Sequence, residues 1–257
     1  MLDFGLMEKM KEVYHDPVLV RAQIVFNDSA AGLETAKEII KTKIKNSRLL
    51  LTVYARSRRR TGSDQASIIQ TIVGEMWRWE QLVVGAETKA RTFQLEALAA
   101  KDYWEAVRVI CYQVEDWHRV YPHATDVLSI LLNTGYVALG RKVKKILLES
   151  GLLLEFGILH GKNSRLPLIY DVMEIFRQPA VDAVIMPIFS RRPKSGVEKG
   201  SREFRKAIAL MIERWQERFL YNGRKETMER ILFLEICQLK RAIVEERPWK
   251  PILTSVS

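Results

Sequence analysis

The sequence has few cysteines and no long apolar run, and both absences exclude classes of protein. Cys111 and Cys237 lie far apart and form no C-x-x-C pair, which excludes a disulfide framework and a zinc ribbon and favours a reducing compartment. No uncharged apolar stretch approaches the roughly 18 to 20 residues that a membrane helix needs. The opening segment carries Asp3, Glu8 and Glu12, which targeting peptides avoid. We therefore expect a cytoplasmic protein without a membrane partner.

The sequence also lacks the common catalytic motifs. It contains no G-x-x-x-x-G-K-[ST] or G-x-G-x-x-G phosphate-binding loop, no H-E-x-x-H zinc motif and no nucleophile elbow. What it has in excess is positive charge. Forty-one Lys and Arg residues against 31 Asp and Glu residues give a net charge of +10. This balance favours a polyanionic partner, although it also fits an RNA-binding protein, a membrane-surface protein or a merely basic soluble surface.

Apolar residues recur at helical spacing along most of the chain, and β alternation is almost absent. The pattern predicts one all-α, multi-helix domain. Capping residues precede several helices, Pro167 suits the first turn of one helix, and Pro179 should kink or split it. The expected helices cover residues 31–56, 64–85, 87–110, 125–151, 167–190, 201–222 and 224–246, with loops at 56–63, 151–166 and 190–201.

Three acids and one histidine stand out against this pattern. Asp171 and Glu174 share one helix face inside the apolar stretch LIYDVMEIFR, where two carboxylates need a compensating cation. His160 lies in the glycine-flanked loop before that helix, and Glu96 lies among small residues in LEALAAKDYW. Each has an ordinary alternative: a solvated face or pairing with Arg177 for the two acids, a structural histidine, and simple amphipathicity around Glu96. Taken together, carboxylates plus one imidazole suit Mg²⁺ or Mn²⁺ and phosphodiester chemistry.

Several strings then resemble, in the same order, segments of the CRISPR-associated spacer integrase and endonuclease family. That family reads approximately LNYGYALL, GFLH and R-x-SLVYDLMEPFR, with Thr134 here in place of Tyr and Pro167 in place of Ser. The resemblance extends over roughly residues 20 to 250. It is carried by KEIIKTKIKNSRLLL (37–51), QLEALAAKDYW (94–104), LNTGYVAL (132–139), GILHG (157–161) and RLPLIYDVMEIFR (165–177).

The resemblance implies a fold, a site and partners. It implies an N-terminal lead-in over residues 1–19 and a helical catalytic domain over residues 20–257, with the family's N-terminal β domain absent. Glu96, His160 and Asp171 would be the catalytic residues that bind Mg²⁺ or Mn²⁺, and Glu174 would assist them. The implied activity is DNA cleavage and 3′-OH strand transfer in spacer acquisition. The implied partners are DNA, a second copy in a homodimer, and a small ferredoxin-like CRISPR-associated protein.

Basic loops would contact the phosphates of DNA in this interpretation, although each fits a solvated charged loop equally well. The main alternative is a non-catalytic DNA-binding helical module, and a more distant one is an unrelated helical interaction protein. Weak cleavage with tight, salt-sensitive DNA binding would favour the binding module. The candidate phosphate contacts are Arg58, Arg59, Arg60, Lys162, Arg165, Arg191 and Arg192.

Overall fold

Helices dominate the computed structural model, which describes residues 16–111, 117–161, 165–191 and 197–252. The all-α prediction is confirmed, because the described residues hold one two-stranded sheet and are otherwise helices and connections. Within these ranges no helix combines the length and the apolar character that crossing a membrane requires. The Lys162 and Arg192 candidates, and the first fifteen residues of the expected lead-in, lie outside the described residues.

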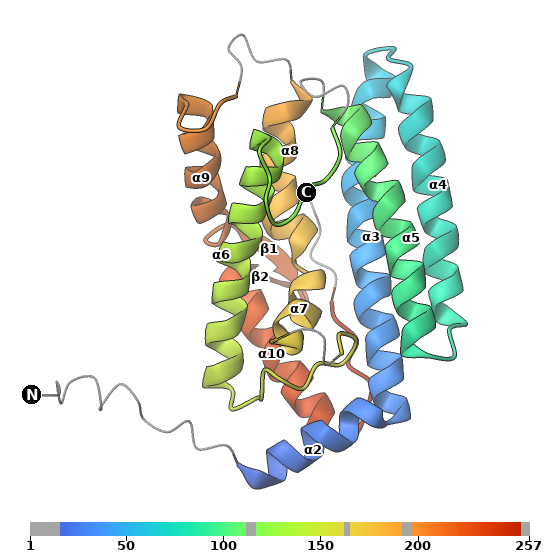
Figure 1. The fold of residues 1–257 in the computed structure, drawn as a ribbon, viewed down its shortest axis with the longest axis vertical. Helices are drawn as coiled ribbons and strands as arrows, with labels where there is room; N and C mark the ends of the chain where they lie inside the picture. The colour runs from blue at the N-terminus through green and yellow to red at the C-terminus, as the bar shows by residue number, and fades with distance from the viewer. Residues whose placement is uncertain (1–15, 112–116, 162–164, 192–196, 253–257) are drawn as a thin grey trace, which may run out of the picture.

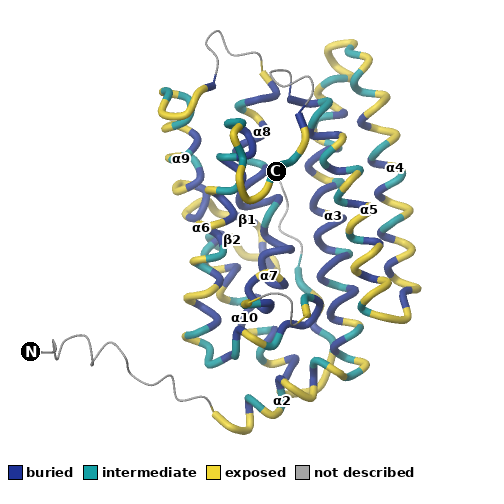
Figure 2. Tube along the Cα trace, in the orientation of Figure 1, coloured by how far each residue is buried: buried dark blue, intermediate teal, exposed yellow. Residues whose placement is uncertain are grey.

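Three long helices form one side of the molecule. They are α3 (Ala30–Arg60), α4 (Gln65–Val84) and α5 (Lys89–Ile110), which pack side by side along most of their lengths (Figure 1). The Ser29 and Thr88 side chains cap α3 and α5 by accepting backbone N–H bonds, as residues of this type do at helix starts. Figure 2 shows that the outer faces of α4 and α5 are exposed, whereas α3 is largely buried.

The other side is built around α6 (Val127–Glu149), whose start is capped by the Asp126 side chain. Against it lie α7 (Pro167–Glu174), the π-helical turn η1 (Gln178–Asp182), α8 (Ala183–Ser190) and α9 (Arg202–Arg214). α2 (Pro17–Asp28) runs across one end of the molecule and packs against α3 and α10 (Met228–Val244) (Figure 1). α7 and η1 contact both α3 and α6, so this short segment joins the two sides.

The break between α7 and α8 falls where Pro179 predicts it. Pro179 cannot supply the N–H that would continue a regular helix, and residues 178–182 adopt a wider π-helical turn. Asn46 on α3 supports the end of α7 from outside, because its Nδ2 donates to the Ile175 carbonyl oxygen at 2.8 Å. Asn46 and Ile175 are both buried, so the bond satisfies polar groups that water cannot reach.

Two sequence-based predictions are wrong. Residues 56–60 are not a loop, because α3 continues to Arg60 before it ends at Thr61. The segment expected as the end of one helix and the start of the next is a β-hairpin, with β1 (Arg218–Tyr221) paired antiparallel to β2 (Arg224–Thr227). Asn222 and Gly223 form its turn, both with positive φ, which suits a tight two-residue hairpin connection.

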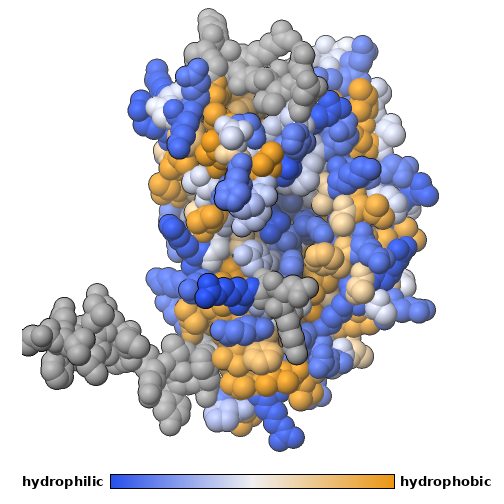
Figure 3. Space-filling view, viewed as in Figure 1, coloured by the Kyte–Doolittle hydropathy of each residue, from blue (hydrophilic) through white to orange (hydrophobic). Residues whose placement is uncertain are grey.

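The surface is mixed in character. On the face seen in Figure 3, hydrophilic side chains gather around a central hollow, and hydrophobic ones gather at the lower end over α2. Val18, Ile24 and Val25 of α2 are exposed hydrophobic residues. The polar centre of this face is the part that bears on function, since α5, α6 and α7 meet there.

Candidate active site

Two carboxylates from different helices share one ammonium group. Lys43 of α3 donates a hydrogen bond to Oε1 of Glu96 on α5, and its Nζ lies 2.6 Å from Oε2 of Glu174 on α7. All three side chains are largely buried, and the Glu174 side chain is only 4% exposed. The structure therefore brings Glu96 and Glu174 to a common cation, although 78 residues, the difference between 174 and 96, separate them in the chain.

Arg177 supplies a second positive charge to Glu174. Its Nη2 lies 3.1 Å from Glu174 Oε1, so the sequence-based alternative in which Arg177 pairs with an acid is confirmed. Burial alone would raise the pKa of Glu174, but the charges of Arg177 and Lys43 outweigh it and lower that pKa. Glu174 is thus held as a carboxylate in a buried position, as a ligand for a cation must be.

Asp171 has different surroundings, because both of its carboxylate oxygens accept hydrogen bonds from the loop before α7. Its Oδ2 accepts from the Ile158 and Leu159 backbone N–H groups at 2.5 and 3.2 Å, and its Oδ1 accepts from the His160 N–H at 3.0 Å. The His160 ring completes the set, with Nδ1 2.6 Å from Oδ1. Asp171 is fully buried, so these bonds fix residues 158–160 and the His160 ring.

The His160 ring is held by Asp171 on one side and by aromatic rings on two others. It lies edge-on to Phe93 of α5 at 5.6 Å between ring centroids, and 5.9 Å from Tyr170 of α7. Burial lowers the pKa of His160, but the hydrogen bond and the negative charge of Asp171 outweigh it and raise that pKa. Because Nδ1 is bound to Asp171, Nε2 is the nitrogen left for a ligand.

The loop that carries His160 is also tied to α2. The Gln23 amide donates to the carbonyl oxygens of Leu153 and Phe156 at 2.7 and 3.1 Å, and its oxygen accepts from the Leu153 N–H at 2.9 Å. Gln23 is buried, and the three bonds use both ends of its amide. An irregular loop is thereby kept in a single path between α6 and α7.

The predicted trio is only partly brought together. Glu96 faces Lys43 and Glu174, whereas His160 and Asp171 face each other. Across the described ranges, no three carboxylate, imidazole or thiol groups converge closely enough to coordinate one ion. Lys43 lies between the two glutamates at the position where a cation would balance them. That Glu96, His160 and Asp171 bind metal stays a prediction.

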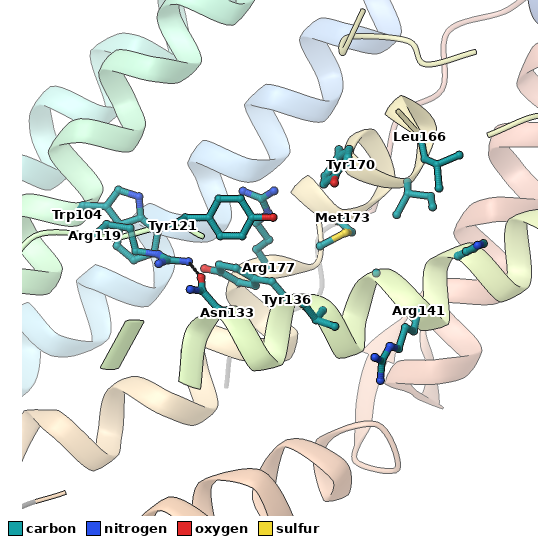
Figure 4. Close-up of a pocket in the computed structure, with 14 residues that line it drawn as sticks. Trp104, Arg119, Tyr121, Asn133, Tyr136, Arg141, Leu166, Tyr170, Met173 and Arg177 are labelled. Carbon is teal, nitrogen blue, oxygen red and sulfur yellow. Dashed lines mark hydrogen bonds between the residues drawn. The ribbon is translucent and has the colours of Figure 1, made fainter. Parts of the chain in front are cut away.

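A cavity of about 510 Å³ opens beside Arg177, between α6 and α7 (Figure 4). Among the described residues its lining combines cations, aromatic rings and apolar side chains, without an acid. The guanidinium carbon of Arg177 lies 5.2 Å from the centre of the Tyr136 ring, and that of Arg119 lies 5.4 Å from the Trp104 ring. A smaller cavity of about 130 Å³ shares Trp104, Tyr136 and Arg177 with it and extends to Lys43 and Glu96. The lining residues include Trp104, Arg119, Tyr121, Tyr136, Arg141, Lys144, Tyr170 and Arg177.

A buried carboxyl group fixes the aromatic wall of this cavity. Asp182 of η1 accepts from the hydroxyls of Tyr103 and Tyr136 at 2.6 and 2.7 Å. Burial raises the pKa of Asp182 to about 6, although the two tyrosine hydrogen bonds work against the rise. Because Asp182 belongs to η1 while the tyrosines belong to α5 and α6, the network holds three elements around the cavity.

The basic residues predicted to contact DNA lie in three places. Arg58 is partly buried, and its Nη2 donates to the Ser190 carbonyl oxygen at 2.8 Å, which ties the end of α3 to the end of α8. Arg59 and Arg60 are exposed in the last turn of α3, and Arg191 is exposed just after α8. Arg165 is exposed just before α7. None of these arginines lines the cavity beside Arg177.

Sequence reasoning missed Lys43, Arg119 and the Asp182 network. Lys43 was within reach, because it lies in the string KIKN, where a lysine breaks the apolar face of the helix. Arg119 and Asp182 had no comparable signal. The position of Arg119 depends on the return of residues 117–126 to α6, and that of Asp182 on the π-helical turn that brings it to Tyr103 and Tyr136, neither of which periodicity describes.

Comparison with known proteins identifies relatives. The model of the family described as CRISPR associated protein Cas1 matches residues 5–205. The chain is 26% identical to the CRISPR-associated endonuclease Cas1 1 of Archaeoglobus fulgidus, over 83% of this chain and 69% of that protein. It is 29% identical to the CRISPR-associated endonuclease Cas1 of Korarchaeum cryptofilum, over 80% of this chain and 64% of that protein. The chain thus spans about two thirds of the length of these relatives.

Solved structures share the fold. A casposase bound to integration product aligns with a TM-score of 0.72 at 19% identity, over 93% of this chain and 69% of that chain. A Cas1 protein from Thermotoga maritima aligns with a TM-score of 0.69 at 15% identity, over 89% of this chain and 72% of that chain. A chain of a Cas6-RT-Cas1–Cas2 complex aligns with a TM-score of 0.74 at 19% identity, over 91% of this chain and 26% of that chain.

Proposed function

Because the chain belongs to the CRISPR-associated Cas1 family, we propose that it is a divalent-metal-dependent DNA endonuclease and integrase of spacer acquisition. The observation that carries the proposal is the pair of buried glutamates, Glu96 and Glu174, held on one cation beside a cationic, aromatic cavity. Curated relatives are named endonucleases, and a protein of the same fold is described as a casposase bound to integration product.

The donor types, two carboxylates and one imidazole, are those that Mg²⁺ and Mn²⁺ accept, although among the described residues no three of them converge on one point in the metal-free arrangement. Glu96, Glu174 and Nε2 of His160 would hold the ion, and Asp171 would orient His160 through Nδ1. We assign this positioning role to Asp171 because its oxygens already accept three backbone N–H groups, whereas Glu174 Oε2 has no aligned hydrogen-bond donor among the described residues. When bound, such an ion polarises a phosphodiester for attack by water or by a 3′-hydroxyl.

The chain's own residues would position the DNA. Arg119, Arg141, Lys144 and Arg177 present positive charge around the cavity, and Tyr121 and Tyr170 add exposed aromatic rings. A single strand suits this combination, because its phosphates pair with guanidinium groups while its bases stack on aromatic rings. Arg177 touches both the cavity and Glu174, so a strand bound there would bring a phosphate towards the glutamates.

The partners implied by the family are also part of the proposal. We expect a homodimer and a small ferredoxin-like CRISPR-associated protein, acting with DNA in the cytoplasm. One structure of the same fold is described as a Cas6-RT-Cas1–Cas2 complex. A second candidate function is a non-catalytic DNA-binding module. One observation favours it: Lys43 and Arg177 together already balance the charges of the two glutamates without an ion.

Cleavage and strand joining on branched and duplex DNA, with and without Mn²⁺, test the proposal. Glu96→Gln, Glu174→Gln and His160→Ala should each lower activity by about 100-fold or more while DNA binding survives. Glu75→Gln is the control, because Glu75 pairs with Arg78 on the α4 surface, away from the site. If the wild-type protein binds DNA but cleaves and joins none with either Mg²⁺ or Mn²⁺, the chain is a DNA-binding module and not an enzyme.

Asp171→Asn separates a ligand from a positioning residue. Asparagine removes the charge that raises the pKa of His160, so an NMR titration should report a lower His160 pKa. If Asp171 only positions His160, the Asp171→Asn variant should lose less Mn²⁺ affinity than the Glu174→Gln variant. Equal losses of Mn²⁺ affinity in both variants would return Asp171 to the set of ligands.

A further inference from the structure

Lys43 is the least ordinary member of the site, because it offers an ammonium group where the proposed function requires a metal ion. It lies on α3 and reaches carboxylates on α5 and α7, and none of these groups is close in sequence to another. Lys43 itself is 9% exposed. A lysine is seldom buried to this degree unless it is paired, and here one ammonium is paired twice.

The two contacts of Lys43 differ in kind. The contact with Glu96 Oε1 has the geometry of a hydrogen bond. The contact with Glu174 Oε2 is 2.6 Å long, yet that oxygen has no aligned hydrogen-bond donor within the described parts of the chain. One ammonium group therefore contacts a carboxylate oxygen of each glutamate, and it helps to keep Glu174 charged.

We propose that Lys43 is a built-in placeholder cation, which pairs Glu96 with Glu174 in the metal-free protein and is displaced when a divalent ion binds. This inference rests on the proposed function, since it concerns the same two glutamates. Two positive charges already contact these glutamates, those of Lys43 and Arg177. Arg177 holds the other oxygen of Glu174, so Lys43 is the cation whose departure frees an oxygen on each glutamate.

The placeholder has two consequences for the protein. Without metal, it prevents the repulsion that two neighbouring buried carboxylates would otherwise exert. With metal, it weakens the apparent affinity, because the ion must first replace an ammonium in contact with both ligands. The site therefore needs a higher metal concentration to be half-filled than the same two glutamates would need without Lys43.

Mn²⁺ binding to the full chain, followed by calorimetry, tests the proposal with Lys43→Met and Lys43→Arg. Lys43→Met should bind Mn²⁺ on the order of tenfold more tightly than the wild type and melt at a lower temperature in EDTA. Mn²⁺ should raise its melting temperature by more than that of the wild type. Lys43→Arg keeps the charge and should bind Mn²⁺ no more tightly than the wild type.

The matched control is Lys41→Met, because Lys41 lies on the same helix and pairs with Glu38 at 2.8 Å, outside the site. It should leave Mn²⁺ affinity unchanged. If Lys43→Met binds Mn²⁺ as the wild type does, or more weakly, Lys43 is a permanent structural cation and the placeholder role is wrong. If the wild type shows no Mn²⁺ binding that Glu96→Gln removes, the metal site and the proposed function fail together.

A second measurement needs no variant. Acetylation of lysines in the wild-type chain, quantified by mass spectrometry, should label Lys43 several-fold faster after Mn²⁺ is added, because the displaced ammonium becomes accessible. The labelling of Lys41 should not change. Saturating Mn²⁺ that leaves the labelling of Lys43 unchanged overturns the displacement.

Discussion

Gly157 illustrates how one residue controls the loop that carries His160. A Cβ atom at Gly157 would lie 2.6 Å from the His160 carbonyl oxygen, 2.6 Å from Pro167 Cβ and 2.9 Å from Asp171 Oδ2. Two of these neighbours are backbone or ring atoms that cannot rotate away. The Asp171 contact is equally constrained, because that oxygen already accepts two backbone N–H groups.

Gly157→Ala should therefore lower the free energy of unfolding by about 1–3 kcal/mol, measured by urea denaturation. Cleavage should fall with it, because the loop can accommodate a methyl group only by moving His160 or Asp171. Gly161→Ala is the matched control in the same loop, since a Cβ there meets no described atom within 4 Å. A Gly157→Ala protein as stable and as active as the Gly161→Ala protein would show that the loop is not constrained as described.

Single residues also mark the limit of sequence reasoning. The sequence reasoning selected Glu96, His160, Asp171 and Glu174 from their types and settings, and all four lie in the region where α5, α7 and the loop before α7 meet. The different surroundings of Asp171 and Glu174, on which their proposed roles rest, could not be predicted. It depends on the path of residues 157–160 beneath α7, which brings three backbone N–H groups to Asp171, and on a lysine 53 residues before Glu96.

At the scale of elements, α6 offers the clearest test of the proposed DNA-binding surface. Arg141 and Lys144 are exposed on α6 and line the cavity beside Arg177. Replacing both with Gln should weaken DNA binding, measured by fluorescence anisotropy over a series of salt concentrations. The slope of log K against log salt should become shallower by about 0.9 for each DNA phosphate that the variant no longer neutralises.

Lys145→Gln serves as the control for α6. Lys145 is the next residue and is also exposed, but it does not line the cavity. Its Nζ lies 3.9 Å from Glu149 Oε1. It should leave the salt dependence unchanged. Equal effects of Lys145→Gln and the double variant would mean that the helix contributes only general positive charge.

Helices were predictable as elements, and the hairpin was not. Apolar periodicity over many turns predicts long helices such as α4 and α5. Asp126 and Pro167 are residues of the types found at helix starts. The hairpin has strands of four residues each, too short for alternation to stand out beside two amphipathic helices. Its one clear signal is Asn222–Gly223. The arginines after residue 56 suggested a loop, yet arginine is a good helix former and α3 continues through them.

On the scale of the whole molecule, buried carboxyl groups make stability depend on pH. Burial raises the pKa of Asp182 to about 6 and that of Glu235 to about 7. The unfolded chain has lower values for both, so in the window from about pH 4 to 7 the folded protein binds more protons. The free energy of unfolding must then fall as pH rises through this window, on the order of 3 kcal/mol for each group.

Urea denaturation between pH 4.5 and 8 should show this decline. His160 adds to it, because its pKa is also raised in the folded protein. Glu174 acts in the opposite sense only at lower pH, since its lowered pKa gives stability that is lost as pH falls below about 4.5. Glu235→Gln should flatten the decline, and a stability that instead rises steadily from pH 5 to 8 would contradict the assignment.

Glu235 belongs to a junction that closes the fold late. It accepts from Trp249 Nε1 at 3.1 Å and from the Ile252 N–H at 3.0 Å, while the Trp249 N–H donates to Thr35 on α3. Thr35 precedes Trp249 by 214 residues. During translation α3 leaves the ribosome long before residues 249–252 exist, so nascent chains pass through a stage in which this junction is open. We expect protease protection of α3 to be complete only after residues 249–252 have left the ribosome, which pulse-proteolysis of chains stalled at different lengths would measure.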